Sequence, residues 1–180
     1  MNPKLAKTIK NYRGCSERNS SMNIQQKLDV RKAFKLRIHE SNGNAFDDLF
    51  CDVMRASNKD FKKVKPQGRI GDRKNDGFIP LEGKYFQVYS PQSPTGNPTS
   101  ATSKIEKDLD GLIAYWGDEH KYKINHFYFV FNDKYHGAYP EIYTTLNSVK
   151  NKYGLDICDV FLSSELEDVF MELPEDSIAS

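Results

Sequence analysis

Hydrophobic and polar positions follow helical and strand periods in turn along this chain. Phe46, Leu49, Phe50 and Val53 fall at i, i+3, i+4 and i+7, which predicts one buried helix face. The aromatic-rich run 124–131 predicts a strand. Helices are further expected over about 22–40, 103–116, 139–152 and from 163 or 164 onward, and strands over about 60–65, 76–81, 84–90 and 155–162. Because strands and helices alternate in the second half, we expect an α/β fold: a central mixed β-sheet with one antiparallel hairpin, flanked by helices.

The same pattern predicts how the chain is organised. Residues 1–21 are polar and read as an arm, with Ser20 or Ser21 as the cap of the first helix. Residues 22–173 are expected to form a single domain. Residues 174–180 form a predicted tail, which could lead into a further C-terminal domain.

The hairpin carries the candidate chemistry. With Glu82-Gly83 as its turn, Leu81 lies opposite Lys84, and Asp76 and Gln87 become diagonal neighbours on one face. That face is expected to point away from the core, which takes the opposite set of side chains: Ile79, Leu81, Phe86 and Val88.

Asp76 and Gln87 would present two side-chain oxygens to one hard cation, Mg²⁺ or Mn²⁺. Such an ion activates water and neutralises charge at a phosphate, and a nearby lysine would stabilise the transition state. The competing interpretation is that Asp76-Gly77 is only turn chemistry.

Charge is unevenly distributed although the net charge is +1. Residues 59–74 carry seven Lys/Arg and two Asp, whereas residues 155–180 carry eight Asp/Glu and no Lys/Arg. The basic cluster either follows a phosphate backbone or is ordinary solvated surface. Its candidate nucleic-acid-binding residues are Lys62, Lys63, Lys65, Arg69, Arg73 and Lys74.

The order of a helix with Phe46-Asp47-Asp48-Leu49-Phe50, then Gly71-Asp72 through Asp76-Gly77, then Phe86-Gln87-Val88 resembles the PD-(D/E)XK restriction-endonuclease-like superfamily, in particular its Mrr-like branch. The resemblance implies Asp76 and Gln87 as metal ligands, with Asp48 near the acidic residue of the first helix. Tyr89 stands where the family has its catalytic lysine. A substitute from the following helix would be Lys104 or Lys107, and Lys104 is preferred because it comes first after the loop.

The resemblance implies a metal-dependent DNA endonuclease domain of a prokaryotic anti-phage or restriction defence protein, with Mg²⁺ or Mn²⁺ as cofactor. The chain also resembles N-terminal domains of bacterial multi-component defence proteins, including those that work beside an ABC-type ATPase. The alternative is a catalytically degenerate module of the same fold that binds nucleic acid or a partner protein. Three distant cysteines predict no disulfide framework, and the absence of a long apolar run predicts a cytoplasmic protein without a membrane span; the sequence leaves oligomerisation open.

Overall fold

The computed structural model describes residues 22–65, 74–96 and 98–178. The predicted arm 1–21, with Ser20 and Ser21, and the basic residues Arg69 and Arg73 lie outside the described residues. The elements follow the predicted order, and their bounds are α2 Ile24–Glu40, α3 Asn44–Ser57, β1 Lys62–Lys63, β2 Gly77–Ile79, η2 Pro80–Glu82, β3 Lys84–Tyr89, α4 Thr99–Leu112, η3 Ile113–Glu119, β4 His126–Phe131, α5 Pro140–Tyr153, β5 Ile157–Leu162, α6 Ser163–Met171 and α7 Glu175–Ile178.

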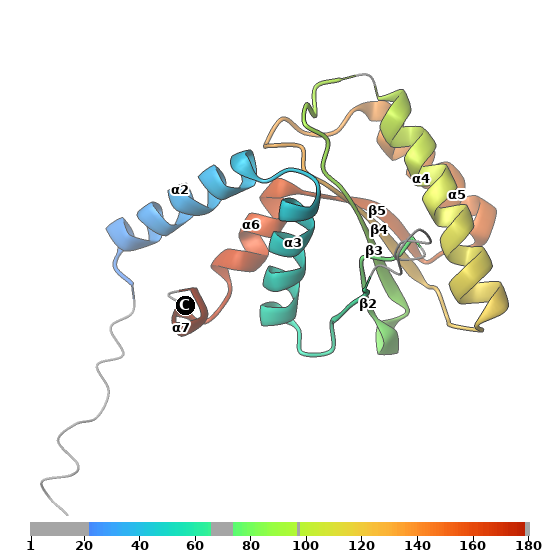
Figure 1. Cartoon of the computed structure of the whole chain (residues 1–180), viewed down its shortest axis with the longest axis horizontal. Coiled ribbons are helices and arrows are strands. Elements are labelled where there is room, and N and C mark those ends of the chain that lie inside the picture. Colours follow the sequence, from blue (N-terminus) through green and yellow to red (C-terminus); the bar gives the residue numbers. More distant parts are fainter. Residues whose placement is uncertain (1–21, 66–73, 97, 179–180) are drawn as a thin grey trace, which may run out of the picture.

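The five strands form one sheet in the order β1-β2-β3-β4-β5. β1, β2 and β3 pair antiparallel, whereas β3–β4 and β4–β5 pair parallel, with α4 and α5 as the crossovers. Figure 1 shows α3 and α6 on one side of this sheet and α4 and α5 on the other. The predicted α/β class, a mixed sheet with an antiparallel hairpin between helical layers, is therefore confirmed.

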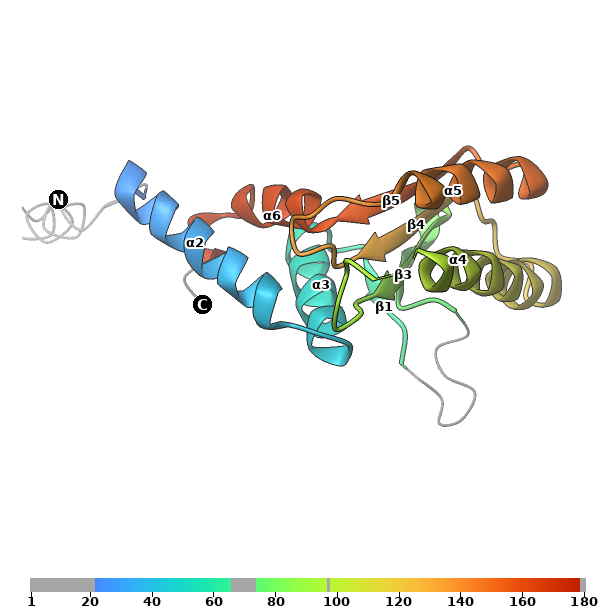
Figure 2. The ribbon, with the colours of Figure 1, turned by 90° about the horizontal axis from the view of Figure 1, so that it is seen from above.

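Both faces of the sheet are buried, because each carries its own hydrophobic core. Phe86 of β3 and Val130 of β4 pack with Phe50 of α3 and Leu166 of α6. On the other face, the side chains of β4 that alternate with Val130 pack with α4 and α5: Phe127, Phe129 and Phe131. The view from above shows these two helical layers apart, separated by the strands (Figure 2). The expectation that the Asp76–Gln87 face points away from a core is therefore wrong.

The ends of α2, α5 and α6 are stabilised by specific capping residues. Asn23 begins α2 with a reciprocal capping box, in which its Oδ1 accepts from Gln26 N at 2.9 Å. Gly154, the predicted stop of α5, adopts the left-handed conformation at φ 64°. Ser163 begins α6, but its hydroxyl does not cap the helix; it donates to Asn132 Oδ1 at 3.2 Å. Glu165 satisfies this helix start instead, by accepting from Leu162 N at 2.6 Å.

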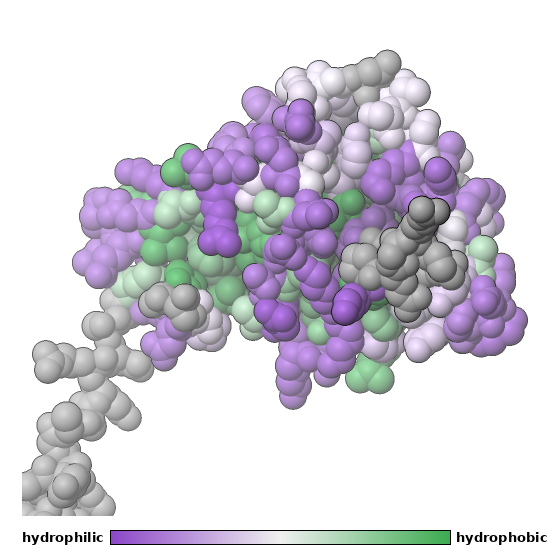
Figure 3. Space-filling model, in the orientation of Figure 1, coloured by the Kyte–Doolittle hydropathy of each residue, from purple (hydrophilic) through white to green (hydrophobic). Residues whose placement is uncertain are grey.

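Helix α2 lies at the margin of the molecule and extends beyond α6 (Figures 1 and 2). Its buried side chains are Phe34 and Ile38, and Phe34 stacks on Phe170 of α6 with ring centroids 4.2 Å apart. Hydrophobic side chains gather between α2 and α3 in Figure 3, where a groove of about 510 Å³ includes Phe34, Val53 and Phe170 among its lining residues.

The start of α2 meets the short helix α7, which forms within the segment predicted as a tail. The backbone N–H of Met22 donates to both carboxylate oxygens of Glu175 at 2.8 Å. Across the described part of the chain, none of the helices combines the length and the apolar character needed to cross a membrane.

Candidate functional site

The hairpin that holds the candidate site pairs in a different register from the predicted one. Ile79 lies opposite Lys84, and Gly77 lies opposite Phe86. The connection is therefore longer than Glu82-Gly83: Pro80–Glu82 form a 3₁₀ turn and Gly83 closes it at φ 59°. A shift of two residues keeps the faces of the strands, so Ile79 and Phe86 are buried as predicted, but Leu81 moves into the connection and is 89% exposed.

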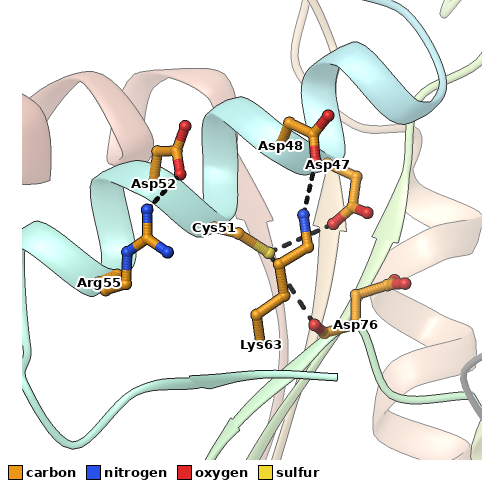
Figure 4. A network of polar contacts seen from close by, with 7 residues as sticks. All are labelled: Asp47, Asp48, Cys51, Asp52, Arg55, Lys63 and Asp76. Carbon is orange, nitrogen blue, oxygen red and sulfur yellow. Dashed lines mark hydrogen bonds and ion pairs between the residues drawn. The ribbon is translucent and has the colours of Figure 1, made fainter. Parts of the chain in front are cut away.

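Three neighbours fix the backbone of Asp76, the residue before β2. Its N–H donates to Phe86 O at 3.0 Å, and its carbonyl oxygen accepts from Val64 N at 3.0 Å. The Cys51 thiol of α3 also contacts this carbonyl, with Sγ 3.9 Å from the oxygen. Figure 4 shows the carboxylate of Asp76 pointing away from α3 and from Asp47 and Asp48. The position of this carboxylate is thus set by backbone contacts on either side of the hairpin.

The carboxylate of Asp76 contacts Gln87 directly. Its Oδ2 accepts from Gln87 Nε2 at 2.6 Å and from the backbone N–H of Val88 at 2.5 Å. Both side chains are buried, at 8% exposure for Asp76 and 4% for Gln87. The predicted proximity of these two side chains is confirmed, and it is closer than a diagonal pairing would give.

Gly77 follows Asp76 for a packing reason. A Cβ at this position would lie 2.2 Å from Cζ of Phe61, so the ring of Phe61 occupies the space of a side chain. The Asp-Gly sequence is therefore not a turn here: Gly77 is the first residue of β2, and the turn begins three residues later, at Pro80.

Two lysines, one from α4 and one from the segment before β2, meet at one buried carboxylate of α4. Asp108 is 1% exposed and pairs with Lys74 at 2.9 Å and with Lys104 one turn earlier on α4. Tyr89, in the position of the family lysine, shares a hydrogen bond of 3.0 Å with Ser100 at the start of α4. Lys107, the other nominated lysine, is exposed. The nominated Lys104 is thus held on the side of α4 that carries Asp108.

Asp108 lies on the same side of the sheet as Gln87. Tyr89 contacts Ser100 of α4, and Tyr85 lies 6.0 Å from Trp116, which follows α4, so the helix runs antiparallel to β3. Gln87 is between the two tyrosines along β3, as Asp108 is between their partners along the helix. Sequence analysis missed Asp108 because it reads as one more acidic residue on an amphipathic helix; its i, i+4 spacing from Lys104 was the available signal.

The structure does not bring Asp48 to this pair. Asp48 lies on α3 and forms an ion pair of 2.5 Å with Lys63, on the other face of the sheet (Figure 4). Its neighbour Asp47 faces inward and contacts the Cys51 thiol at 3.3 Å. Burial, together with the charge of Asp47, raises the pKa of that thiol far above its ordinary range.

The basic cluster is divided between two faces. Lys62 pairs with Phe78 and Lys63 with Gly77 across the β1–β2 ladder, so their side chains point to opposite sides. Lys62 and Lys65 are exposed, whereas Lys63 and Lys74 are engaged by Asp48 and Asp108. Burial is the largest single influence on Lys63 and lowers its pKa, but the hydrogen bond to Asp48 and the negative charges around the lysine together outweigh it, so the pKa is raised.

Two buried amides, Gln87 of the site and Asn75 next to Asp76 in the sequence, carry polar atoms without hydrogen-bond partners among the described residues: Oε1 of Gln87, and both Oδ1 and Nδ2 of Asn75. Asn75 is fully buried beside Asp76. Within residues 22–65, 74–96 and 98–178, no three His, Cys, Asp or Glu side chains are grouped to hold a metal ion. Ligation of a cation here would rest on one carboxylate, on amide oxygens and on water.

Comparison with known proteins adds no relative. No protein-family model matches the chain, and neither a curated protein nor a solved structure matches it significantly.

Proposed function

We propose that this chain hydrolyses phosphodiester bonds of nucleic acid with a divalent cation held by Asp76 and Gln87. The observation that carries the proposal is Gln87 Oε1, a buried acceptor without a hydrogen-bond partner among the described residues, next to a buried carboxylate. Such groups are rare in folded proteins, because an unsatisfied buried polar atom costs about 1–3 kcal/mol.

The orientation of the Gln87 amide follows from Asp76. With Nε2 2.6 Å from Oδ2 of Asp76, a reversed amide would set its oxygen against the carboxylate, so the nitrogen must face Asp76. The oxygen is then left to bind a cation or water. This arrangement suits Mg²⁺, which binds to one or two carboxylates and keeps several waters. When bound, such an ion supplies Lewis acidity and an activated water.

The protein side chains then have separate tasks. Asp76 would bind and orient the cation, and its own backbone is fixed by hydrogen bonds to Phe86 and Val64. Lys104 supplies the positive charge that Tyr89 cannot, since a tyrosine hydroxyl donates or accepts a hydrogen bond but is never a cation. Asp108 holds Lys104 and Lys74 beside the hairpin. DNA as substrate, and an ABC-type ATPase as partner in a defence complex, are parts of this proposal that rest on the resemblance.

Nicking of supercoiled plasmid by the purified full chain with Mg²⁺ or Mn²⁺ tests the proposal. The parent should nick, and Asp76→Asn, which keeps the shape of the side chain, should lose the activity. Asp52→Asn is the matched control, because Asp52 is an exposed aspartate of α3 that pairs with Arg55 of the same helix at 2.8 Å. A parent that neither nicks plasmid nor binds either metal by calorimetry contradicts the proposal, as does an active Asp76→Asn.

A second candidate is a non-catalytic module of the same architecture. It is favoured by the hydrogen bond from Val88 N, because this bond makes the Asp76 carboxylate a substitute for a backbone acceptor where the β2 ladder ends. Binding of nucleic acid without metal-dependent cleavage, unaffected by Asp76→Asn, would support this function over hydrolysis.

A further inference from the structure

An aromatic surface lies beside the candidate site, around Phe78 of β2, the strand that begins directly after Asp76. Phe78 is half-buried and stacks on Tyr85 of β3, with ring centroids 5.4 Å apart and planes 21° apart. Trp116 and Tyr122 approach Phe78 from η3 and the segment after it, at 5.3 Å and 6.3 Å. Stacked and tilted rings at these distances form one continuous cluster.

The cluster has a buried end and an exposed end. Tyr85 is 1% exposed, and burial raises its pKa to about 12. Phe78 is the next ring toward the sheet edge, and its cross-strand neighbour on β1 is Lys62, whose side chain is exposed. Within the described residues, the stack of rings running from β3 through β2 therefore ends at Phe78. A further flat group can extend it at the position of the exposed Lys62 side chain, which is the cross-strand neighbour of Phe78 among the described residues.

The η3 segment fixes the other side of this surface. The π-helix Ile113–Glu119 is closed by Tyr122, whose N–H donates to Trp116 O at 2.7 Å. Trp116 and Tyr122 are 5.3 Å apart with planes at 73°, and Tyr122 is 45% exposed. Single-turn π-helical segments are frequent at functional sites.

Lysines alternate with the exposed aromatic residue. Lys121 and Lys123 flank Tyr122 in the sequence and are exposed, as is Lys62 on β1. Two exposed acidic residues, Asp118 and Glu119, precede this run on η3. The positive charge is therefore confined to the lysines next to Tyr122 and Phe78 and does not continue along η3. Rings interleaved with lysines are the composition of surfaces that stack bases and follow a phosphate backbone.

We propose that Phe78, Tyr122 and Lys62 bind an unstacked nucleobase, so that the substrate is nucleic acid that is single-stranded or, as in supercoiled plasmid, locally unpaired. This inference rests on the proposed function for its link to catalysis. Phe78 is two residues from Asp76, about 7 Å along the strand. A base on Phe78 would therefore place a neighbouring phosphate at Asp76. In duplex DNA the faces of the bases are already stacked and cannot reach the ring.

Trp116 reports on this surface because it is the only tryptophan of the 180-residue chain. Its fluorescence is followed while the full chain is titrated in EDTA with single-stranded oligothymidylate, with a duplex of equal length, and with inorganic polyphosphate. We expect saturable quenching by the single strand alone, since polyphosphate has the charge without the bases. Equal quenching by the duplex, or no quenching at saturation, overturns the inference.

The variants separate stacking from charge. Phe78→Leu and Tyr122→Ala should each weaken single-strand binding about tenfold, and Tyr122→Phe should restore it. Tyr143→Ala is the matched control, because Tyr143 of α5 is 44% exposed and lies on another element. Parent-like binding by both Phe78→Leu and Tyr122→Ala contradicts the inference. Because EDTA removes catalysis, failure of the plasmid assay contradicts the proposed hydrolysis and leaves this binding result standing.

Discussion

Lys74, two residues before Asp76, pairs with the buried carboxylate of Asp108 on α4 at 2.9 Å. The segment before β2 is thereby linked to α4, the helix that covers the sheet face on which Gln87 lies. Lys104 approaches the other oxygen of this carboxylate. Two cations on one buried anion make Asp108 the centre of the polar side of the α4 interface.

The first prediction concerns this triad. Lys104→Ala alone should cost about 1 kcal/mol, because Lys74 still compensates Asp108. Lys74→Ala/Lys104→Ala should cost about 3–5 kcal/mol, more than the two single changes together, because a buried carboxylate is left unpaired. Urea unfolding of the four proteins measures the coupling. Lys107→Ala, an exposed lysine of the same helix, is the control and should change stability little; strictly additive single effects would contradict the triad.

A second prediction treats Asp76 as part of the fold. Asp76→Ala removes the acceptor of Gln87 Nε2 and of Val88 N and should lower the free energy of unfolding by about 2 kcal/mol. Asp76→Asn keeps an acceptor oxygen and should cost less. Chemical denaturation at neutral pH measures both. An alanine variant as stable as the parent would show that the hydrogen bonds to Asp76 contribute nothing.

The third prediction concerns pH and Glu165. Desolvation, together with the charges of Asp159 and Asp133, raises the pKa of this carboxyl above its usual value of 4.5, although the hydrogen bond from Leu162 N opposes the shift. A raised folded-state pKa favours the protonated folded state, so this contribution to stability is complete below about pH 4.5 and is lost as the pH rises through the folded-state pKa.

Glu165→Gln should therefore raise the melting temperature relative to the parent more at pH 7 than at pH 4. Glu172→Gln is the control, because Glu172 is a second exposed glutamate that lines the same cavity, at the other end of α6. Thermal unfolding at several pH values measures both, and a gain from Glu165→Gln that is constant with pH would rule out the effect.

The fourth prediction concerns the thiols. Cys51 is 2% exposed and burial raises its pKa strongly, so it should resist alkylation by iodoacetamide at pH 8 in the folded protein. Cys158 is half-buried, and desolvation raises its pKa to about 12, so it should react slowly. Peptide mass spectrometry distinguishes the sites, and both should react fully in denaturant. Rapid modification of native Cys51 would disprove the packing of α3 against Asp76.

The sequence predicts most of the elements because their signals are local. The period of Phe46, Leu49, Phe50 and Val53 finds α3, and all four are buried. The Asp76–Gln87 contact is found because alternation fixes the faces of a hairpin even when the register is displaced by two residues. Leu81 is misplaced because the 3₁₀ turn Pro80–Glu82 has no signal distinct from a strand end.

Contacts between distant segments explain the rest. The pairing of Lys74 with Asp108 joins residues far apart in sequence, and a charged helix position gives no sign of burial until the helix is placed on the sheet. For the same reason, the sequence gives no sign that Lys104 pairs with a buried carboxylate and that its removal would lower the free energy of unfolding. The aromatic residues of β4 pack in or against the two cores, whereas Tyr122, two residues before the run 124–131, emerges beside Phe78 because η3 closes on it.

Helix α2 has a consequence for how the molecule opens. It is held by the Phe34–Phe170 stack, by Ile38 and by the Arg31–Glu167 ion pair at 3.2 Å, while Ile24 remains 81% exposed. Few buried contacts mean a low local free energy of opening. We expect the amides of α2 to exchange with solvent deuterium well before those of β3 and β4. Each such excursion uncovers the apolar surface of α3 while the strands that carry Asp76 and Gln87 stay paired.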